Sequence, residues 1–113
     1  SNHYVYLIGA DKLSDELNEI SEAVNADYTQ LELDYTYNAD DDPNRFYYRS
    51  DHYNFAKNNI PVIFYFNGTH KDYHKISDTA DKIELDALRI RAQLVFYTAW
   101  TLANRTNRIK LNP

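Results

Sequence analysis

Two histidines, a tyrosine and several aspartates lie close together in one polar segment of the sequence, and these side chains could take part in metal-dependent chemistry. The segment spans residues 67–83 and contains His70, Tyr73, His74 and Asp78. A neutral imidazole is a common zinc ligand, and a nearby carboxylate can orient the ring by accepting its second N–H. The two histidines have the spacing of a helical zinc pair, but the glutamate of the His-Glu-x-x-His signature is missing and the flanks do not read as helical. From the residues alone, two surface histidines in a polar loop are the more common alternative.

Two further groups of polar residues could bind a ligand, although a structural explanation is open for each. Ser50, Asp51 and His52 stand together and could line a pocket, or Ser50 could cap a helix whose polar residues satisfy the local backbone. The three aspartates at 40–42 could bind calcium. The ligand spacing of a calcium-binding loop is absent there, which favours a solvated turn.

The composition limits the classes of protein to which the chain can belong. Its 113 residues, 43% hydrophobic and 26% charged, predict one small domain or a piece of a larger one. The net charge of −5 argues against nucleic-acid binding, and the lack of cysteine excludes disulfides and cysteine-based zinc sites. No apolar run is long enough to predict a membrane span. The chain has no methionine, so we expect that a natural start residue is missing or was trimmed; Ser1 and Asn2 could be residues left by cloning.

Hydrophobic periodicity predicts three strands. Residues 4–8 and 62–66 are short, strongly apolar runs, which are typical of buried strands. Residues 31–37 alternate between apolar and polar side chains. This alternation predicts a strand with one buried and one exposed face, near the edge of a sheet.

Three helices are predicted between and after these strands. Ser14 is placed to cap an amphipathic helix over residues 14–25, and Ser50 to cap a short helix through Lys57. A long helix closes the chain, with apolar residues that step by three and four. We predict that this apolar stripe covers the sheet. The stripe consists of Leu85, Leu88, Ala92, Val95, Ala99 and Leu102.

The order strand, helix, strand, short helix, strand, long helix predicts an α/β fold. We expect a three-layer α/β/α sandwich with a mixed sheet. Ligands of such sheets bind at the carboxyl ends of the strands. On fold grounds, therefore, we expect the segment after the third strand, residues 67–83, to carry the chemistry.

Four stretches of the sequence together resemble the di-zinc aminopeptidase family. They are Tyr-Arg-Ser-Asp-His-Tyr-Asn-Phe at 48–55, Ile-Pro-Val-Ile-Phe at 60–64, Gly-Thr-His-Lys-Asp-Tyr-His at 68–74 and Ser-Asp-Thr-Ala-Asp-Lys-Ile at 77–83. The family includes secreted bacterial leucyl aminopeptidases, with glutamate carboxypeptidase and transferrin receptor as relatives. The resemblance extends over residues 4–105 in the expected order, and the combination of stretches is more specific than any one of them.

The resemblance implies roles for particular side chains. In this family two zinc ions share a bridging carboxylate and a water, and a glutamate is the general base. His74, which follows Tyr73 in the loop after the last strand, is implied to be a zinc ligand. The phenol of Tyr73 is implied to donate a hydrogen bond to the oxyanion of the tetrahedral intermediate. His70 and Asp78 are expected to support the site without binding zinc. The residues expected to line the substrate pocket are Ser50, Asp51 and His52.

The remaining ligands of the family precede the region that this sequence resembles. The sequence contains no Glu-Glu pair, and the His-x-Asp letters at 70–72 stand in the wrong place. We therefore expect residues 1–113 to be the C-terminal portion of a catalytic domain whose parent protein is a zinc aminopeptidase acting on peptides. The portion alone is expected to be inactive, to hold no zinc stably, and to associate with itself through an uncovered sheet edge. By analogy with secreted relatives, we expect the parent to be extracytoplasmic, either periplasmic or secreted.

Two other functions stay open at this point. A non-catalytic relative could use the same fold to bind proteins, as transferrin receptor does, although such a relative has no need to keep a ligand like His74. A glutaminyl-cyclase-like acyl transfer is less favoured, because that branch usually departs from the Asp-Thr-x-Asp pattern at 78–81.

Overall fold

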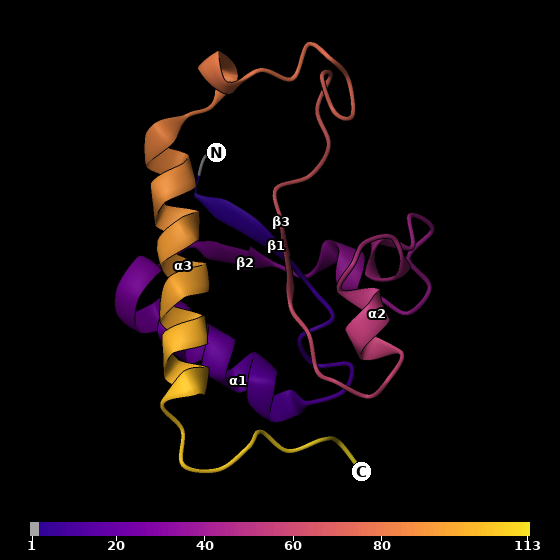
Figure 1. Ribbon diagram of the computed structural model, residues 1–113, viewed down its shortest axis with the longest axis vertical. Coiled ribbons are helices and arrows are strands. Elements are labelled where there is room, and N and C mark those ends of the chain that lie inside the picture. Colours follow the sequence, from indigo (N-terminus) through magenta and orange to yellow (C-terminus); the bar gives the residue numbers. More distant parts are fainter. Residues whose placement is uncertain (1–2) are drawn as a thin grey trace.

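The computed structural model describes residues 3–113, so the interpretation of Ser1 and Asn2 lies outside the described residues. Strands and helices alternate along the chain as the sequence predicts, and short helical turns join them (Figure 1). The elements are β1 (Tyr4–Ile8), α1 (Asp15–Val24), β2 (Glu32–Asp34), α2 (Tyr53–Ala56), β3 (Phe64–Phe66) and α3 (Leu85–Ala103).

The three strands form one mixed sheet, which confirms the predicted fold class. Their order is β2-β1-β3, with β1 parallel to β2 and antiparallel to β3. Tyr4 lies opposite Glu32 in the parallel pair, and Leu7 lies opposite Tyr65 in the antiparallel pair. The central strand β1 therefore joins two strands that run in opposite directions.

The side chains of β1 alternate between the two faces of the sheet, and a layer covers each face. Val5 and Leu7 are buried in a core that also contains residues of α1 and α3. Ile8 is buried on the other face, against Phe46 and Tyr47 of the segment that leads to α2. Figure 1 shows α1 and α3 crossing on one side and the α2 segment on the other. The result is a sheet between two layers, as predicted.

Helix α1 begins where the sequence predicts, for the predicted reason. The backbone N–H of Leu17 donates to Ser14 Oγ at 3.2 Å, and acids occupy the first turn. The helix is followed by a wider helical turn at Asn25–Thr29. Asn25 stabilises this turn, because its side chain donates to Leu31 O and accepts from Leu31 N.

Three hydroxyl groups tie α1, β3 and α3 together. Ser21 Oγ lies 2.8 Å from the phenol oxygen of Tyr65, which lies 3.1 Å from Thr98 Oγ1. Ser21 and Thr98 are buried, and burial also raises the pKa of Tyr65 above its usual value. The three groups satisfy one another in a region with little access to water.

The strand predicted at 31–37 is shorter than expected. β2 ends at Asp34, whose carboxylate accepts hydrogen bonds from the N–H of Thr36 at 2.8 Å and from its hydroxyl at 2.5 Å. This local bonding turns the chain into a short helix at Thr36–Asn38. The predicted strand was too long because the alternation of polar and apolar residues continues to residue 37, beyond the bend at Asp34.

The helix predicted at 50–57 and the strand predicted at 62–66 are also shorter. Ser50 does not cap a helix through its side chain: α2 starts at Tyr53, and Ser50 contributes only its carbonyl, which accepts from Tyr53 N at 3.1 Å. β3 begins at Phe64, because the antiparallel pairing with β1 reaches only as far as Ile8.

The face of α3 that covers the sheet was predicted wrongly. Leu94 and Thr98 are the buried residues of this helix, with Ile90 and Tyr97 packed against the same core. Leu85, Leu88 and Val95, from the predicted stripe, are exposed. Because α3 is apolar on more than one side, periodicity could not select the buried face; the hydroxyl of Thr98 pairs with Tyr65 there. In residues 3–113, no helix has the length and apolar character that crossing a bilayer requires.

Candidate functional site

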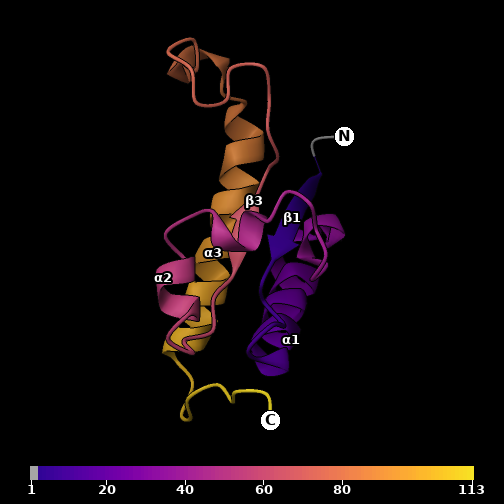
Figure 2. The same ribbon diagram turned by 90° about the vertical axis from the view of Figure 1, so that its right-hand side faces the viewer.

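The loop after β3 carries most of the candidate residues, and it lies at an unexpected edge of the sheet. Because β3 is antiparallel to β1, the end of β3 lies beside the start of β1: Tyr4 Oη donates to Asn67 O at 3.2 Å. The loop therefore follows the carboxyl end of β3, as expected, but lies at the end of the sheet opposite the carboxyl ends of β1 and β2. Figure 2 shows the loop extending beyond the body of the molecule at the start of α3.

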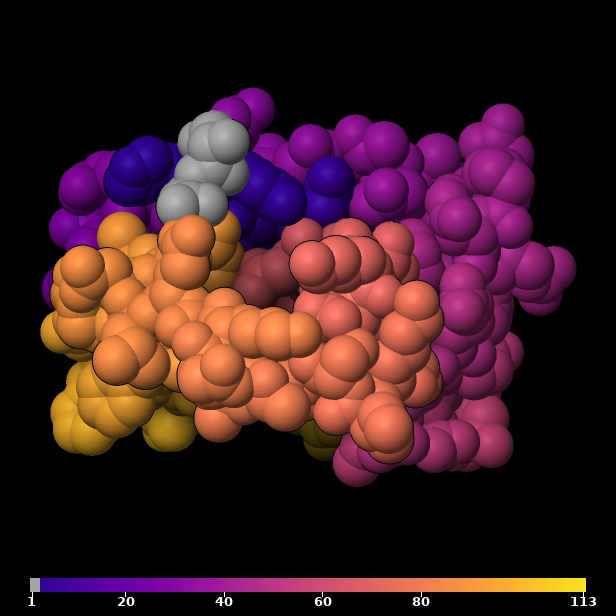
Figure 3. Space-filling model, turned by 90° about the horizontal axis from the view of Figure 1, so that it is seen from above, coloured from indigo at the N-terminus to yellow at the C-terminus, as the bar shows by residue number. Residues whose placement is uncertain are grey.

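A cleft of about 500 Å³ opens between this loop, the start of α3 and the start of β1. Figure 3 looks onto this end of the molecule and shows the surface hollowed between the loop and the orange start of α3. Charged and apolar side chains both line the cleft. They include Tyr4, His70, Asp72, Asp78, Lys82 and Leu88.

Asp72 holds the loop together from the inside. It is buried, whereas residues 74–86 are exposed. Its carboxylate accepts from Ser77 Oγ at 2.7 Å and from Lys82 Nζ at 3.2 Å. The hydrogen bonds from Ser77 and Lys82 lower the pKa of Asp72 below its ordinary value. Nothing in the sequence spacing of Asp72 and Lys82 predicts their contact across the loop.

His74 lies exposed on this loop, next to Tyr73. Its backbone has a φ of +60°, which is uncommon for a residue other than glycine. The ring centroids of Tyr73 and His74 are 4.2 Å apart, and Tyr73 is half-buried against the core on the α2 side of the sheet. Within the described residues, no hydrogen bond or ion pair engages the His74 imidazole, so its nitrogens are accessible to a ligand.

His70 and Asp78, the two residues expected to support the site, lie close to each other. His70 Nε2 lies 3.9 Å from Asp78 Oδ2, and both side chains are about half exposed. His70 Nδ1 accepts a hydrogen bond from the N–H of Asp72 at 3.2 Å. Their expected role as residues that support the site stays a prediction.

The Ser50–Asp51–His52 group lies on the α2 side of the sheet. The His52 ring packs 4.7 Å from the Phe64 ring and 5.8 Å from the Tyr47 ring. Within the described residues its Nε2 is buried without a hydrogen-bond partner, and burial lowers the pKa of His52 below its usual value. Ser50 and Asp51 are exposed. Their role in a substrate pocket stays a prediction.

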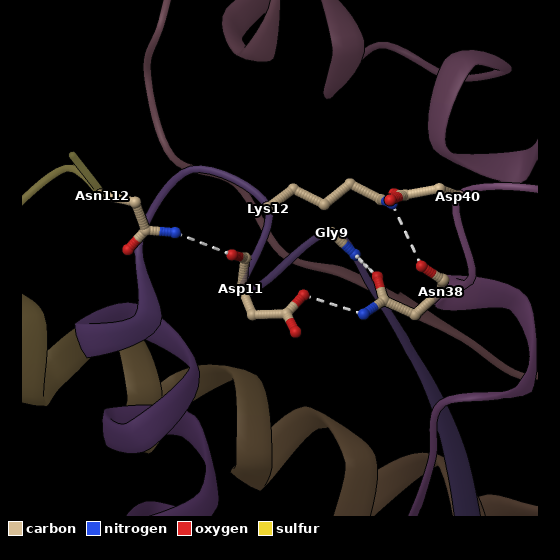
Figure 4. Close-up of polar contacts among 6 residues, drawn as sticks. All are labelled: Gly9, Asp11, Lys12, Asn38, Asp40 and Asn112. Atoms are coloured by element: carbon tan, nitrogen blue, oxygen red, sulfur yellow. Dashed lines mark hydrogen bonds and ion pairs between the residues drawn. The ribbon is translucent and has the colours of Figure 1, made fainter.

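A second polar cluster lies at the opposite edge of the sheet, where the parallel strands end (Figure 4). Asn38 accepts from Gly9 N at 2.7 Å and donates to Asp11 at 2.8 Å. Lys12 Nζ pairs with Asp40 at 2.8 Å and lowers the pKa of that carboxyl. Gly9 has a φ of +88°, and a Cβ there would come within 2.5 Å of the Tyr47 ring. These contacts fold the acidic loop at 40–42 as a turn.

The described residues do not form a complete zinc site. Catalytic zinc needs about three protein ligands, with one position left open. Among residues 3–113, no three histidine, cysteine, aspartate or glutamate side chains are grouped so that they could hold a metal ion. His74 has suitable chemistry and exposure for one ligand. A zinc centre that includes His74 would therefore need further ligands from outside residues 3–113.

Comparison with known proteins gives one match. A family model described as Peptidase family M28 matches residues 2–99 of the chain. No curated protein and no solved structure gives a significant match. The matched region includes the whole candidate loop and the Ser50–Asp51–His52 group.

Proposed function

The chain belongs to peptidase family M28, and on this premise we propose that its parent protein is a zinc-dependent aminopeptidase that removes N-terminal residues from peptides. M28 is a family of di-zinc metallopeptidases, so peptide hydrolysis in general follows from membership. The choice of aminopeptidase rests on the sequence resemblance described above. The observation that carries the proposal is the exposed His74, adjacent to Tyr73, in the loop after the last strand.

In this proposal the chain contributes one metal ligand and the catalytic phenol. His74 binds zinc through its imidazole, while the remaining ligands and the general base come from a preceding part of the same catalytic domain. Bound zinc would supply Lewis acidity to the reaction. Tyr73 donates a hydrogen bond to the developing oxyanion, which is the kind of contact that stabilises a tetrahedral intermediate. Packing against the core limits the movement of the Tyr73 ring.

Substrate recognition is proposed for the Ser50–Asp51–His52 group. The aromatic neighbours of His52 fix the position of its ring, so it can form a rigid wall. Ser50 and Asp51 are exposed beside it and can offer polar contacts to a peptide. Asp51→Ala would then raise KM for aminoacyl substrates more than it lowers kcat.

The test of the aminopeptidase proposal is activity of the full-length parent. Hydrolysis of leucyl and other aminoacyl anilides should be abolished by a chelator and restored by zinc. Blocking the N-terminus of the substrate should abolish hydrolysis as well. A full-length protein that contains bound zinc but hydrolyses no aminoacyl anilide would rule the proposal out.

The second candidate is a non-catalytic relative that binds proteins. The exposed apolar side chains of α3, including Phe96 and Trp100, favour it because such residues mark contact surfaces. The sequence upstream decides between the two candidates. A preceding Glu-Glu pair supports the peptidase, and its loss would leave the parent without a general base.

The isolated chain is proposed to be inactive and to associate with itself. β3 lies at an edge of the sheet described here, and the exposed face of α3 lies on the same side of the molecule, lining a groove with Ile63 and Tyr65. We also propose an extracytoplasmic location for the parent, by analogy with the secreted relatives that the sequence resembles. Cell fractionation with an antibody against the chain tests this location, and recovery in the cytoplasm alone would reject it.

A further inference from the structure

Asp72, Ser77 and Lys82 form a closed polar triangle across the candidate loop. The Asp72 carboxylate accepts from Ser77 Oγ at 2.7 Å and from Lys82 Nζ at 3.2 Å. Lys82 Nζ also donates to the carbonyl oxygen of Ser77 at 2.7 Å. Each corner of the triangle therefore contacts the other two, and its Asp72 corner is buried.

The triangle encloses the turn that carries His74. Within it, Lys75 N donates to Asp72 O at 2.9 Å, and Asp78 N donates to Lys75 O at 3.1 Å. His74 occupies the third position of the Asp72–Lys75 turn with a φ of +60°. That position in a left-handed conformation usually holds glycine or asparagine. Histidine adopts this conformation less readily than glycine, so contacts around the turn help to hold the backbone in place.

We propose that Asp72, Ser77 and Lys82 act as a clamp that keeps the His74 turn in its left-handed conformation and so fixes the direction of the imidazole. Asp72 and Lys82 are then positioning residues that act through His74. The functional part of this proposal rests on the proposed function, because the direction of the imidazole matters only if His74 binds a metal ion. The conformational part of the proposal stands on the geometry of the loop alone.

The chain offers a matched control in Asp78. It is a carboxylate in the same loop, but its ionic contact is with His70 at 3.9 Å. Within the described residues, the Asp78 carboxylate makes no hydrogen bond or ion pair with Lys82 or Ser77. Removing its charge changes the net charge of the loop by the same amount as removing that of Asp72. A general electrostatic effect would therefore appear in both variants, whereas a clamp effect would appear only at Asp72.

The first experiment measures the turn itself by NMR on the 113-residue chain. Backbone shifts and the one-bond Cα–Hα coupling report the φ of His74, and ¹⁵N relaxation reports the mobility of residues 70–82. Asp72→Ala and Lys82→Met should shift His74 toward negative φ and raise the mobility of the loop. Lys82→Arg and the control Asp78→Asn should keep the wild-type values. Unchanged signals from β1 and α1 would show that the fold is intact.

The second experiment separates this proposal from the proposed function. In the full-length parent, Asp72→Ala should lower kcat about tenfold or more with little change in KM, because a misdirected catalytic group loses rate before binding. Lys82→Arg should restore most of the rate that Lys82→Met loses. If His74→Ala retains full activity, the role of His74 is wrong. If Asp72→Ala and Lys82→Met leave the φ and mobility of His74 unchanged, the clamp is overturned, whatever the activity.

Discussion

His74, the proposed zinc ligand, is also a residue with an unusual backbone conformation. A left-handed backbone costs a residue with a side chain roughly 1–2 kcal/mol relative to its preferred conformation. His74 adopts this conformation on an exposed loop, where its ring lies 4.2 Å from the Tyr73 ring. A role of its imidazole would explain why a position that suits glycine holds a histidine.

Replacing His74 by glycine tests this explanation. His74→Gly should raise the free energy of unfolding by about 1 kcal/mol, because glycine accepts a positive φ without strain. His74→Ala should not, since alanine meets the same backbone penalty as histidine. Urea unfolding of the three proteins measures the difference. Equal stabilities of the glycine and alanine variants would show that the turn is not strained at this position.

His52 should make stability depend on pH near neutrality. Burial lowers the pKa of His52 in the folded protein below the value of about 6.5 in the unfolded chain. The unfolded chain therefore binds more protons between these two values, so the free energy of unfolding should be highest above about pH 6.5 and fall as the pH drops below it. His52→Phe, which can keep the ring contacts with Phe64 and Tyr47, should show a smaller decrease between pH 7.5 and 5.5. The same decrease in both proteins would assign the effect to other groups.

The sequence singled out the candidate loop but not the contacts that shape it. His70, Tyr73, His74 and Asp78 could be singled out because their side-chain types suit metal chemistry. The φ of His74 and the burial of Asp72 could not be foreseen, because both depend on how the loop folds back on itself. Outside a helix or strand, a spacing of ten residues between a carboxylate and a lysine does not determine how far apart the two side chains lie.

At the scale of elements, the hydroxyl groups of Ser21, Tyr65 and Thr98 join the two helices of one layer to the edge of the sheet. Removing the central hydroxyl leaves two buried partners without a hydrogen bond. An unsatisfied buried polar group costs about 1–3 kcal/mol. The connection therefore accounts for a substantial part of the stability of the layer.

Tyr65→Phe should lower the free energy of unfolding by about 1–3 kcal/mol, with the fold retained. The matched control is Tyr28→Phe. Tyr28 is exposed and stacks on Tyr97 at 4.2 Å, and this stacking does not require its hydroxyl. The control should change stability by less than about 0.5 kcal/mol. Chemical denaturation measures both, and a Tyr65→Phe variant as stable as the control would contradict the role of the hydroxyl groups.

The elements were predictable where a local signal determined them. Ser14 correctly predicted the start of α1, and the apolar run at 4–8 correctly predicted β1. The end of β2 depends on one carboxylate, that of Asp34, which bonds to its own backbone neighbourhood. The buried face of α3 depends on a partner, Tyr65, from a distant part of the sequence. Neither choice is visible in hydrophobic periodicity.

At the scale of the whole molecule, α3 leaves a broad apolar face uncovered. Trp100 is 60% exposed, Phe96 56% and Leu88 52%, all on the same helix. Monomeric proteins rarely expose so many large apolar side chains together. In the proposed parent this face is covered by another part of the catalytic domain, and in the isolated chain we expect a second copy to cover it.

Val95→Lys should weaken self-association of the isolated chain, because it places a charge in the middle of the uncovered face. Val95 is exposed on α3, so the substitution should cost the fold little. Asn54→Lys adds the same charge to the exposed surface of α2 and serves as the control. Sedimentation velocity over a range of concentrations measures both variants. A wild-type chain that stays monomeric at high concentration would contradict the expectation.

The most direct measurement of the central claim is the effect of His74→Ala on metal content and activity in the full-length parent. We expect His74→Ala to lose about one bound zinc ion per chain and to lower kcat/KM about a thousandfold or more, because a missing ligand weakens zinc binding and removes catalysis. His70→Ala, a histidine of the same loop, should keep the metal and most of the activity. Wild-type zinc content and activity in His74→Ala would show that His74 is not a zinc ligand.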